Sequence, residues 1–144
     1  MRALHLAIAV VAWAGGASAQ QGSISLWRGG GMVLRLESQG DSRQFLVESL
    51  PRDMARRLGI APGAILWQGR RSGDMLAGEA FRYDAGCPPL TYAMNGPAKI
   101  AHGAIALRGL RPGRAPGSCA ATAAVAETLT LTYSSAAKPG GEDE

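Results

Sequence analysis

The chain has few of the side chains on which most enzyme mechanisms depend. Its 144 residues include two cysteines and two histidines, and one histidine, His5, lies in the apolar N-terminal stretch. A serine triad needs a histidine base, for which only His102 remains, and no Gly-x-Ser-x-Gly motif supplies a nucleophile. A zinc site needs several Cys or His ligands at short spacing. We therefore expect no catalytic triad, no metal site and no cofactor.

Paired carboxylates are the remaining route to hydrolysis, as in glycosidases. The candidates in this chain are Glu48, Asp53, Asp74, Glu79 and Asp84. Their spacing singles out no acid–base pair, because Asp74 fits a turn and Asp53 fits the first turn of a helix, where a carboxylate opposes the helix macrodipole. We expect a non-enzymatic protein and keep a small carboxylate-dependent hydrolase as an alternative.

Long hydrophobic runs are absent except at the N-terminus. Residues 1–19 combine a cationic start at Arg2, an apolar run over residues 3–14 and small residues up to Ala19, which is the pattern of a cleaved signal peptide. A membrane-spanning helix needs about 20 apolar residues, so this run is too short to be one. We predict a signal peptide over residues 1–19, a mature protein without a membrane span, and a periplasmic or secreted location.

An excess of one charge is also nearly absent. Fifteen basic against 11 acidic residues give a net charge of +4, which is too small to indicate nucleic-acid binding. Residues 134–144 are small and polar and end in three consecutive acids, so we predict a disordered acidic tail there. The intervening residues 20–133 are enough for a single β domain with one core.

The two cysteines, Cys87 and Cys119, are predicted to form a disulfide, because an exported chain matures where thiols are oxidised. A cross-link across such a loop stabilises the folded state by about 3 to 4 kcal/mol in the chain-entropy model.

Glycine, in contrast, is abundant, with 20 residues in the chain. Glycine-containing turns separate short segments in which polar and apolar residues alternate, as they do in half-buried strands. Leu34 and Leu36 are predicted to share the apolar face of one strand, and Phe45 and Val47 that of the next. At the C-terminal end of the domain, Leu129, Leu131 and Tyr133 are predicted to face inward. The predicted strands cover residues 23–27, 32–38, 43–49, 64–70, 75–84, 90–95, 104–110 and 128–133.

One segment has the marks of a short helix instead. Residues 51–59 begin with proline, place Met54 and Leu58 four apart and end with glycine. The alanine-rich residues 120–126 fit either helix or strand. About eight strands with short connections predict an all-β fold, a small antiparallel up-and-down barrel or a two-sheet sandwich, with one helix and one disulfide.

Several segments of the domain together resemble a known family. They are ILWQGRRSG at 65–73, AGEAF at 77–81, CPPLTY at 87–92, Asn95-Gly96, LRG at 107–109, and Cys119. Over residues 25–133 the chain resembles an uncharacterised bacterial exported β domain that is also found attached to caspase-like peptidases. The resemblance implies a β fold and an accessory role, and it supplies no catalytic residues.

The residues left for function are mainly arginines. We predict a partner-binding surface made of Arg56 and Arg57 on the helix, Arg70 and Arg71 at a hairpin, and Trp67. Guanidinium groups suit an anionic envelope polymer or an acidic protein surface.

An alternative function depends on the tryptophans. Trp27 and Trp67 would line the mouth of an internal cavity if the barrel carried a small ligand, although large aromatic residues in strands also serve as core. A ligand carrier is therefore a second binding hypothesis.

Overall fold

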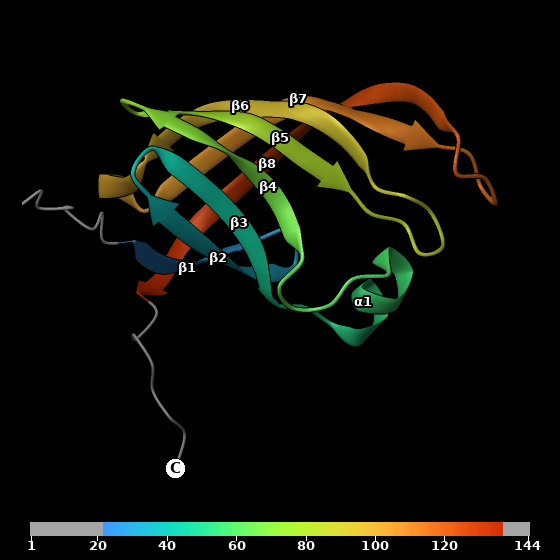
Figure 1. Ribbon diagram of the computed structural model, residues 1–144, viewed down its shortest axis with the longest axis horizontal. Coiled ribbons are helices and arrows are strands. Elements are labelled where there is room, and N and C mark those ends of the chain that lie inside the picture. The colour runs from blue at the N-terminus through green and yellow to red at the C-terminus, as the bar shows by residue number, and fades with distance from the viewer. Residues whose placement is uncertain (1–21, 137–144) are drawn as a thin grey trace, which may run out of the picture.

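The computed structural model describes residues 22–136, which form a closed antiparallel barrel of eight strands in sequence order (Figure 1). The strands are β1 (Ser23–Gly29), β2 (Met32–Gln39), β3 (Ser42–Ser49), β4 (Ile65–Ser72), β5 (Met75–Arg82), β6 (Leu90–Lys99), β7 (Ala104–Arg114) and β8 (Ala121–Ala136). A helix, α1 (Arg52–Leu58), joins β3 to β4, and a 3-10 turn, η1 (Ile100–His102), joins β6 to β7. The predicted up-and-down barrel is confirmed, and the sandwich alternative is wrong.

Side chains fill the inside of the barrel. Because successive residues of a strand point to opposite faces, the apolar member of each alternating pair faces inward, as predicted for Leu34, Leu36, Phe45 and Val47. The buried set is Trp27, Leu34, Leu36, Phe45, Val47, Trp67, Leu76, Ala80, Met94, Ala98, Ile105, Leu107 and Leu131. All of these side chains are apolar, so the centre of the barrel is a packed core.

Two glycines make room for Trp67, one of the two buried tryptophans. Gly69 of β4 lies directly opposite Gly78 of β5. A methyl group on Gly69 would lie 2.7 Å from the Cα of Gly78 and 2.8 Å from Cζ2 of Trp67. The missing side chains therefore allow the Trp67 indole to lie across the junction of β4 and β5.

Helix α1 lies beside one end of the barrel (Figure 1). It begins after Pro51 and stops at Gly59, whose φ of 67° is left-handed and whose N–H donates to the carbonyl of Ala55. The N–H of Ala85, in the connection between β5 and β6, donates to the carbonyl of Arg57. The helix is thus attached to the barrel at the same end as the β5–β6 connection.

The alanine-rich segment left open between helix and strand is a strand. Residues from Ala121 onward belong to β8 and pair with the second half of β7, Ala121 opposite Arg114 and Ala126 opposite Leu110. The two strands form a long hairpin that projects past the barrel (Figure 1). Pairing with β7 overrides the helix propensity of alanine.

The predicted start of the disordered tail is wrong by three residues. β8 continues past Tyr133 to Ala136, with Ser135 opposite Leu26 and Ala136 opposite Ser25. The first half of β1 requires this partner, because otherwise the barrel would have an open edge. The rest of the predicted tail, 137–144, and the predicted signal peptide, 1–19, lie outside the described residues. Within residues 22–136, no helix is long and apolar enough to cross a membrane.

Candidate functional site

Trp67 does not contribute to a surface, contrary to the prediction. Its side chain is completely buried, and its indole Nε1–H donates to the carbonyl of Met94 at 2.9 Å. In the sheet, Trp67 lies opposite Phe45 of β3 on one side and Ala80 of β5 on the other, and both of these residues are also buried. Trp27 is also buried, but, as predicted for a ligand mouth, it lines an opening of the barrel, which is described below.

The four predicted arginines are not brought together. Arg56 and Arg57 are exposed on α1, whereas Arg70 and Arg71 lie near the end of β4 that leads into the β4–β5 turn, at the opposite end of the barrel (Figure 1). Arg70 and Arg71 also point to opposite faces of β4, since they are adjacent in a strand. The prediction that all four arginines belong to one surface is therefore wrong.

The end of the barrel that carries Arg71 is hollow. The strand ends next to the β2–β3 and β4–β5 turns, the 3-10 turn η1 and the start of β1 contribute to the lining of an opening of about 190 Å³, which we call the barrel mouth. Its floor consists of core side chains, and its rim combines serines and arginines with the exposed Ile100 and Tyr133. The lining residues are Ser23, Ser25, Trp27, Leu36, Ser38, Arg43, Arg71, Leu76, Ala98, Ile100 and Tyr133.

Arg43 enters the barrel mouth from β3. One guanidinium nitrogen, Nη1, donates to the carbonyls of Gly40 at 2.6 Å and Ser42 at 2.9 Å. Partial burial lowers the pKa of Arg43, and the positive charge of Arg71 lowers it further, while Asp41 acts in the opposite direction. The positive charges of Arg43 and Arg71 therefore repel each other.

Arg71 is held in a similar way on β4. Its Nε–H donates to the carbonyl of Gly73 at 2.8 Å. The nearest acid, Asp74, lies 3.9 Å from Nη2 and is 87% exposed, so this ion pair contributes little. Among the described residues, Arg43 makes no ion pair. Turn carbonyls orient both guanidinium groups without neutralising them, which leaves positive charge available to a ligand.

An aromatic side chain and hydroxyl groups complete the barrel mouth. The indole of Trp27 donates to the Ser25 hydroxyl oxygen at 2.9 Å. The ring of Tyr133 meets the Trp27 ring edge-on, with centroids 5.4 Å apart. Tyr133 was expected in the core, but it is 46% exposed, because β8 has reached the open end of the barrel there.

A second, wider groove of about 730 Å³ crosses the outside of the barrel wall. A row of polar residues lies across it, Glu37 opposite Gln44, Gln44 opposite Gln68, and Gln68 opposite Glu79. Arg43 borders both this groove and the barrel mouth. The two glutamates are three strand spacings apart, about 14 Å, which exceeds the separation of glycosidase carboxylates, about 5 to 9.5 Å.

The carboxylates considered for hydrolysis lie in separate settings. Glu48 pairs with Arg35 at 2.9 Å and Asp53 with Arg56 at 2.8 Å, whereas Glu79 is exposed on β5. Over residues 22–136, no three His, Cys, Asp or Glu side chains are grouped closely enough to hold a metal ion.

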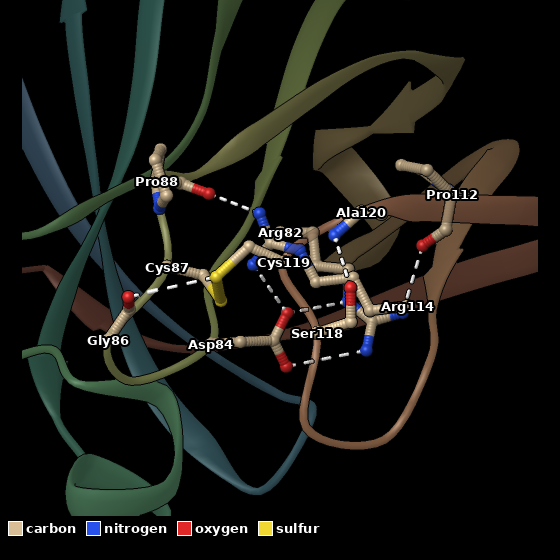
Figure 2. A network of polar contacts seen from close by, with 10 residues as sticks. All are labelled: Arg82, Asp84, Gly86, Cys87, Pro88, Pro112, Arg114, Ser118, Cys119 and Ala120. Atoms are coloured by element: carbon tan, nitrogen blue, oxygen red, sulfur yellow. Dashed lines mark hydrogen bonds and ion pairs between the residues drawn. A yellow bond between two sulfur atoms is a disulfide. The ribbon is translucent and has the colours of Figure 1, made fainter.

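Asp84 belongs to a compact polar network at the other end of the barrel, shown in Figure 2. Arg82 donates to it from Nε at 2.8 Å and Arg114 from Nη1 at 2.9 Å. Arg82 also donates to the carbonyl of Pro112, and Arg114 to that of Pro88. The hydrogen bond from Arg82 is the main cause of the lowered pKa of Asp84. The network ties the β5–β6 connection to the end of β7.

The predicted disulfide is confirmed next to this network. Cys87 and Cys119 are bonded, with their Cα atoms 5.4 Å apart, and Figure 2 shows the bond beside Asp84. It joins the β5–β6 connection to the loop between β7 and β8. The ion pairs and the disulfide together attach the loop end of the projecting hairpin to the β5–β6 connection.

Comparison of the chain with protein-family models, with curated proteins and with solved structures gives no match. The resemblance to the accessory domain of caspase-like peptidases therefore stays a prediction.

The spacing between two arginines and neighbouring core residues in the sequence could have predicted the barrel mouth. Arg43 stands two residues before Phe45, and Arg71 stands four residues after Trp67. In a strand, such spacings place each arginine on the same face as the neighbouring core residue. An arginine at an inward position near a strand end marks an opening of the barrel.

Proposed function

We propose that this protein is an exported, non-catalytic binding module that recognises an anionic group at the barrel mouth. The observation that carries the proposal is the placement of Arg43 and Arg71 on one hollow with an apolar floor. Turn carbonyls orient both guanidinium groups, and their only ion pair among the described residues is the 3.9 Å contact of Arg71 with the exposed Asp74. Charge-assisted hydrogen bonds from guanidinium groups suit carboxylate and phosphate oxygens.

The size of the hollow limits what enters it. About 190 Å³ is smaller than the pockets of about 300 to 1,000 Å³ that enclose whole small molecules, and packed side chains occupy the rest of the interior. The proposed ligand is therefore one anionic group of an envelope polymer or a partner protein, while most of the partner stays outside. A carrier with a large internal cavity has less support.

The proposed location is the periplasm or the medium. A signal peptide over residues 1–19 would deliver the chain there, and the Cys87–Cys119 bond is typical of an oxidising compartment. An accessory role beside a separate enzyme, as the resemblance implies, is consistent with a domain that binds and does not catalyse.

Binding to an acidic polysaccharide tests the proposal. Polygalacturonate would be titrated into the wild type, into the mouth variant R43Q/R71Q and into R56Q/R57Q, which removes the same charge from α1. We expect binding that weakens as salt rises, a loss of at least about tenfold in the mouth variant, and no comparable loss in the helix variant. Equal losses of affinity in both variants would show that binding depends only on the net charge of the protein, and would contradict a specific site.

A further inference from the structure

The projecting hairpin has an open strand edge. β1 pairs with β8 only from Thr132 onward, whereas β7 pairs with β8 from Ala121. Over residues 121–127, within the part of the chain that the structure describes, β8 therefore has a strand neighbour on one side only. The side chains of residues 121–126 are exposed, with Val125 at 68%.

The direction of the free backbone groups follows from one hydrogen bond. The N–H of Tyr133 donates to the carbonyl of Gly103, on the β7 side. In an antiparallel ladder the direction alternates, so Val125 and Glu127 bond toward β7. The N–H and C=O groups of Ala126 and Thr128 point to the open edge. Residues 121–126 contain no charged residue, proline or glycine to block pairing there.

A largely apolar groove of about 310 Å³ lies next to this edge, at the end of the barrel beside α1, and is lined by residues of α1, of β8 and of strands β2, β4, β5, β6 and β7. Its apolar and aromatic lining includes Met32, Met54, Leu58, Tyr83, Tyr92 and Leu129. Three polar side chains of the lining pair with one another, since the Tyr92 hydroxyl donates to Glu127 at 2.8 Å and Arg111 lies 3.4 Å from the other oxygen of Glu127. The groove is therefore suited to apolar side chains.

The edge and the groove are arranged for one added strand. A strand that paired with residues 121–128 would lie on the same side of β8 as β1, beyond the end of β1 at Gly29. Every second side chain of it would lie on the face of β8 that carries Val125, Glu127 and Leu129, and two residues of this face, Glu127 and Leu129, line the groove. Backbone hydrogen bonds would supply affinity, and the groove would supply selectivity.

The charge around the groove indicates what flanks such a strand. Arg57 lines the groove and is exposed, and Arg28 is exposed near the end of β1. Neither has an ion-pair partner among residues 22–136, and Asp53 of α1 forms its ion pair with Arg56. Carboxylates at the ends of the added strand would neutralise these arginines.

We propose that the open edge of β8 binds an extended segment of a partner protein as a ninth strand, with alternating apolar side chains in the groove and acidic residues at its ends. The disulfide and the Asp84–Arg114 pair hold the hairpin in place before binding, which lowers the entropic cost of association. The inference is independent of the barrel mouth, which lies at the opposite end.

A designed peptide tests this proposal on the intact protein. The probe alternates valine and threonine over eight residues and carries two glutamates at each end. Two further versions are N-methylated, one at every valine and the other at every threonine. A strand added by one edge needs the N–H groups of one set only, so we expect one methylated version to bind like the parent and the other to bind at least about tenfold more weakly.

Protein variants supply the second measurement. A126P removes an outward N–H and is expected to weaken binding about tenfold, whereas A126V keeps the N–H and should bind like the wild type. R57E should also weaken binding, whereas R70E, at the other end of the barrel, should not. Thermal unfolding checks that each variant is folded, and if A126P is not, the methylated peptides decide. Equal binding of all three peptides, no binding of the parent peptide, or dimerisation of the protein through this edge in sedimentation would each overturn the proposal.

Discussion

The guanidinium of Arg114 donates to Asp84 across 2.9 Å, and with only 4% of its side chain exposed it depends on that carboxylate. Replacing Asp84 by asparagine would leave a buried positive charge without its counter-ion. We expect D84N to lower the free energy of unfolding by about 2 kcal/mol. Urea unfolding measures this, with D74N as the control, because Asp74 is 87% exposed and forms only a 3.9 Å contact. Equal stability of D84N and the wild type would contradict the role of the pair.

The same ion pair predicts a dependence of stability on pH. Hydrogen bonding to Arg82, and then to Arg114, lowers the pKa of Asp84 below its value in the unfolded chain. Its contribution is therefore present above the unfolded pKa, about 3.9, and is lost as the pH falls through the lower folded pKa. Unfolding free energies measured from pH 6 to pH 2 should fall less steeply for D84N than for the wild type. Parallel curves would contradict this assignment.

The disulfide is expected to stabilise the projecting hairpin. It closes a loop with a sequence separation of 32 residues, and its removal should cost about 3 kcal/mol. In C87S/C119S the thermal midpoint should fall. Hydrogen exchange should become faster in residues 110–126 before it does in the barrel core, because the exposed hairpin contributes little to that core. Uniform loss of protection across all strands would indicate that the bond supports the whole barrel instead.

The facing glycines of β4 and β5 predict a sensitive position. A methyl group on Gly78 would lie 2.6 Å from the Cα of Gly69 and 2.9 Å from the carbonyl carbon of Gln68. G78A should therefore separate the strands and cost at least about 2 kcal/mol. Trp67, which packs beside Gly69, should show altered fluorescence. The neighbouring A77S, on an exposed residue of the same strand, is the control and should leave both measurements unchanged.

Truncation distinguishes the end of β8 from the predicted tail. Removal of residues 137–144 should leave the thermal midpoint nearly unchanged. Removal of residues 134–144 should lower it by several degrees, because the pairs Leu26–Ser135 and Ser25–Ala136 close the barrel. If both truncations gave the wild-type midpoint, these last pairs would not contribute to closure.

Most of the fold was predictable from the sequence because alternation and turn chemistry are local signals. Leu34, Leu36, Phe45 and Val47 have the expected inward positions, and the short helix ends at Gly59 as expected. The alanine-rich residues 121–126 carry no such signal. Their conformation depends on pairing with β7, which is set by residues distant in the sequence.

The candidate site was harder to predict because it depends on which ends of the strands meet. Arg56 and Arg70 were grouped by residue type, yet the barrel separates them. Arg43 and Arg71 come from different hairpins and meet only after the barrel closes. The prediction for Trp67 was also wrong. This large aromatic residue was expected at a surface, but it fills the core next to two glycines that make room for it.

The central claim is that Arg43 and Arg71 together bind an anionic group, and the side-chain Nε–H signals of the arginines test it most directly. Acetate and inorganic phosphate would be titrated into ¹⁵N-labelled protein at constant ionic strength, with R43K and R71K used to assign the two signals. The account predicts saturable shifts of the Arg43 and Arg71 signals, and none of comparable size for Arg56 and Arg57 on α1. Shifts of equal size for all four arginines, or none at the barrel mouth, would contradict it.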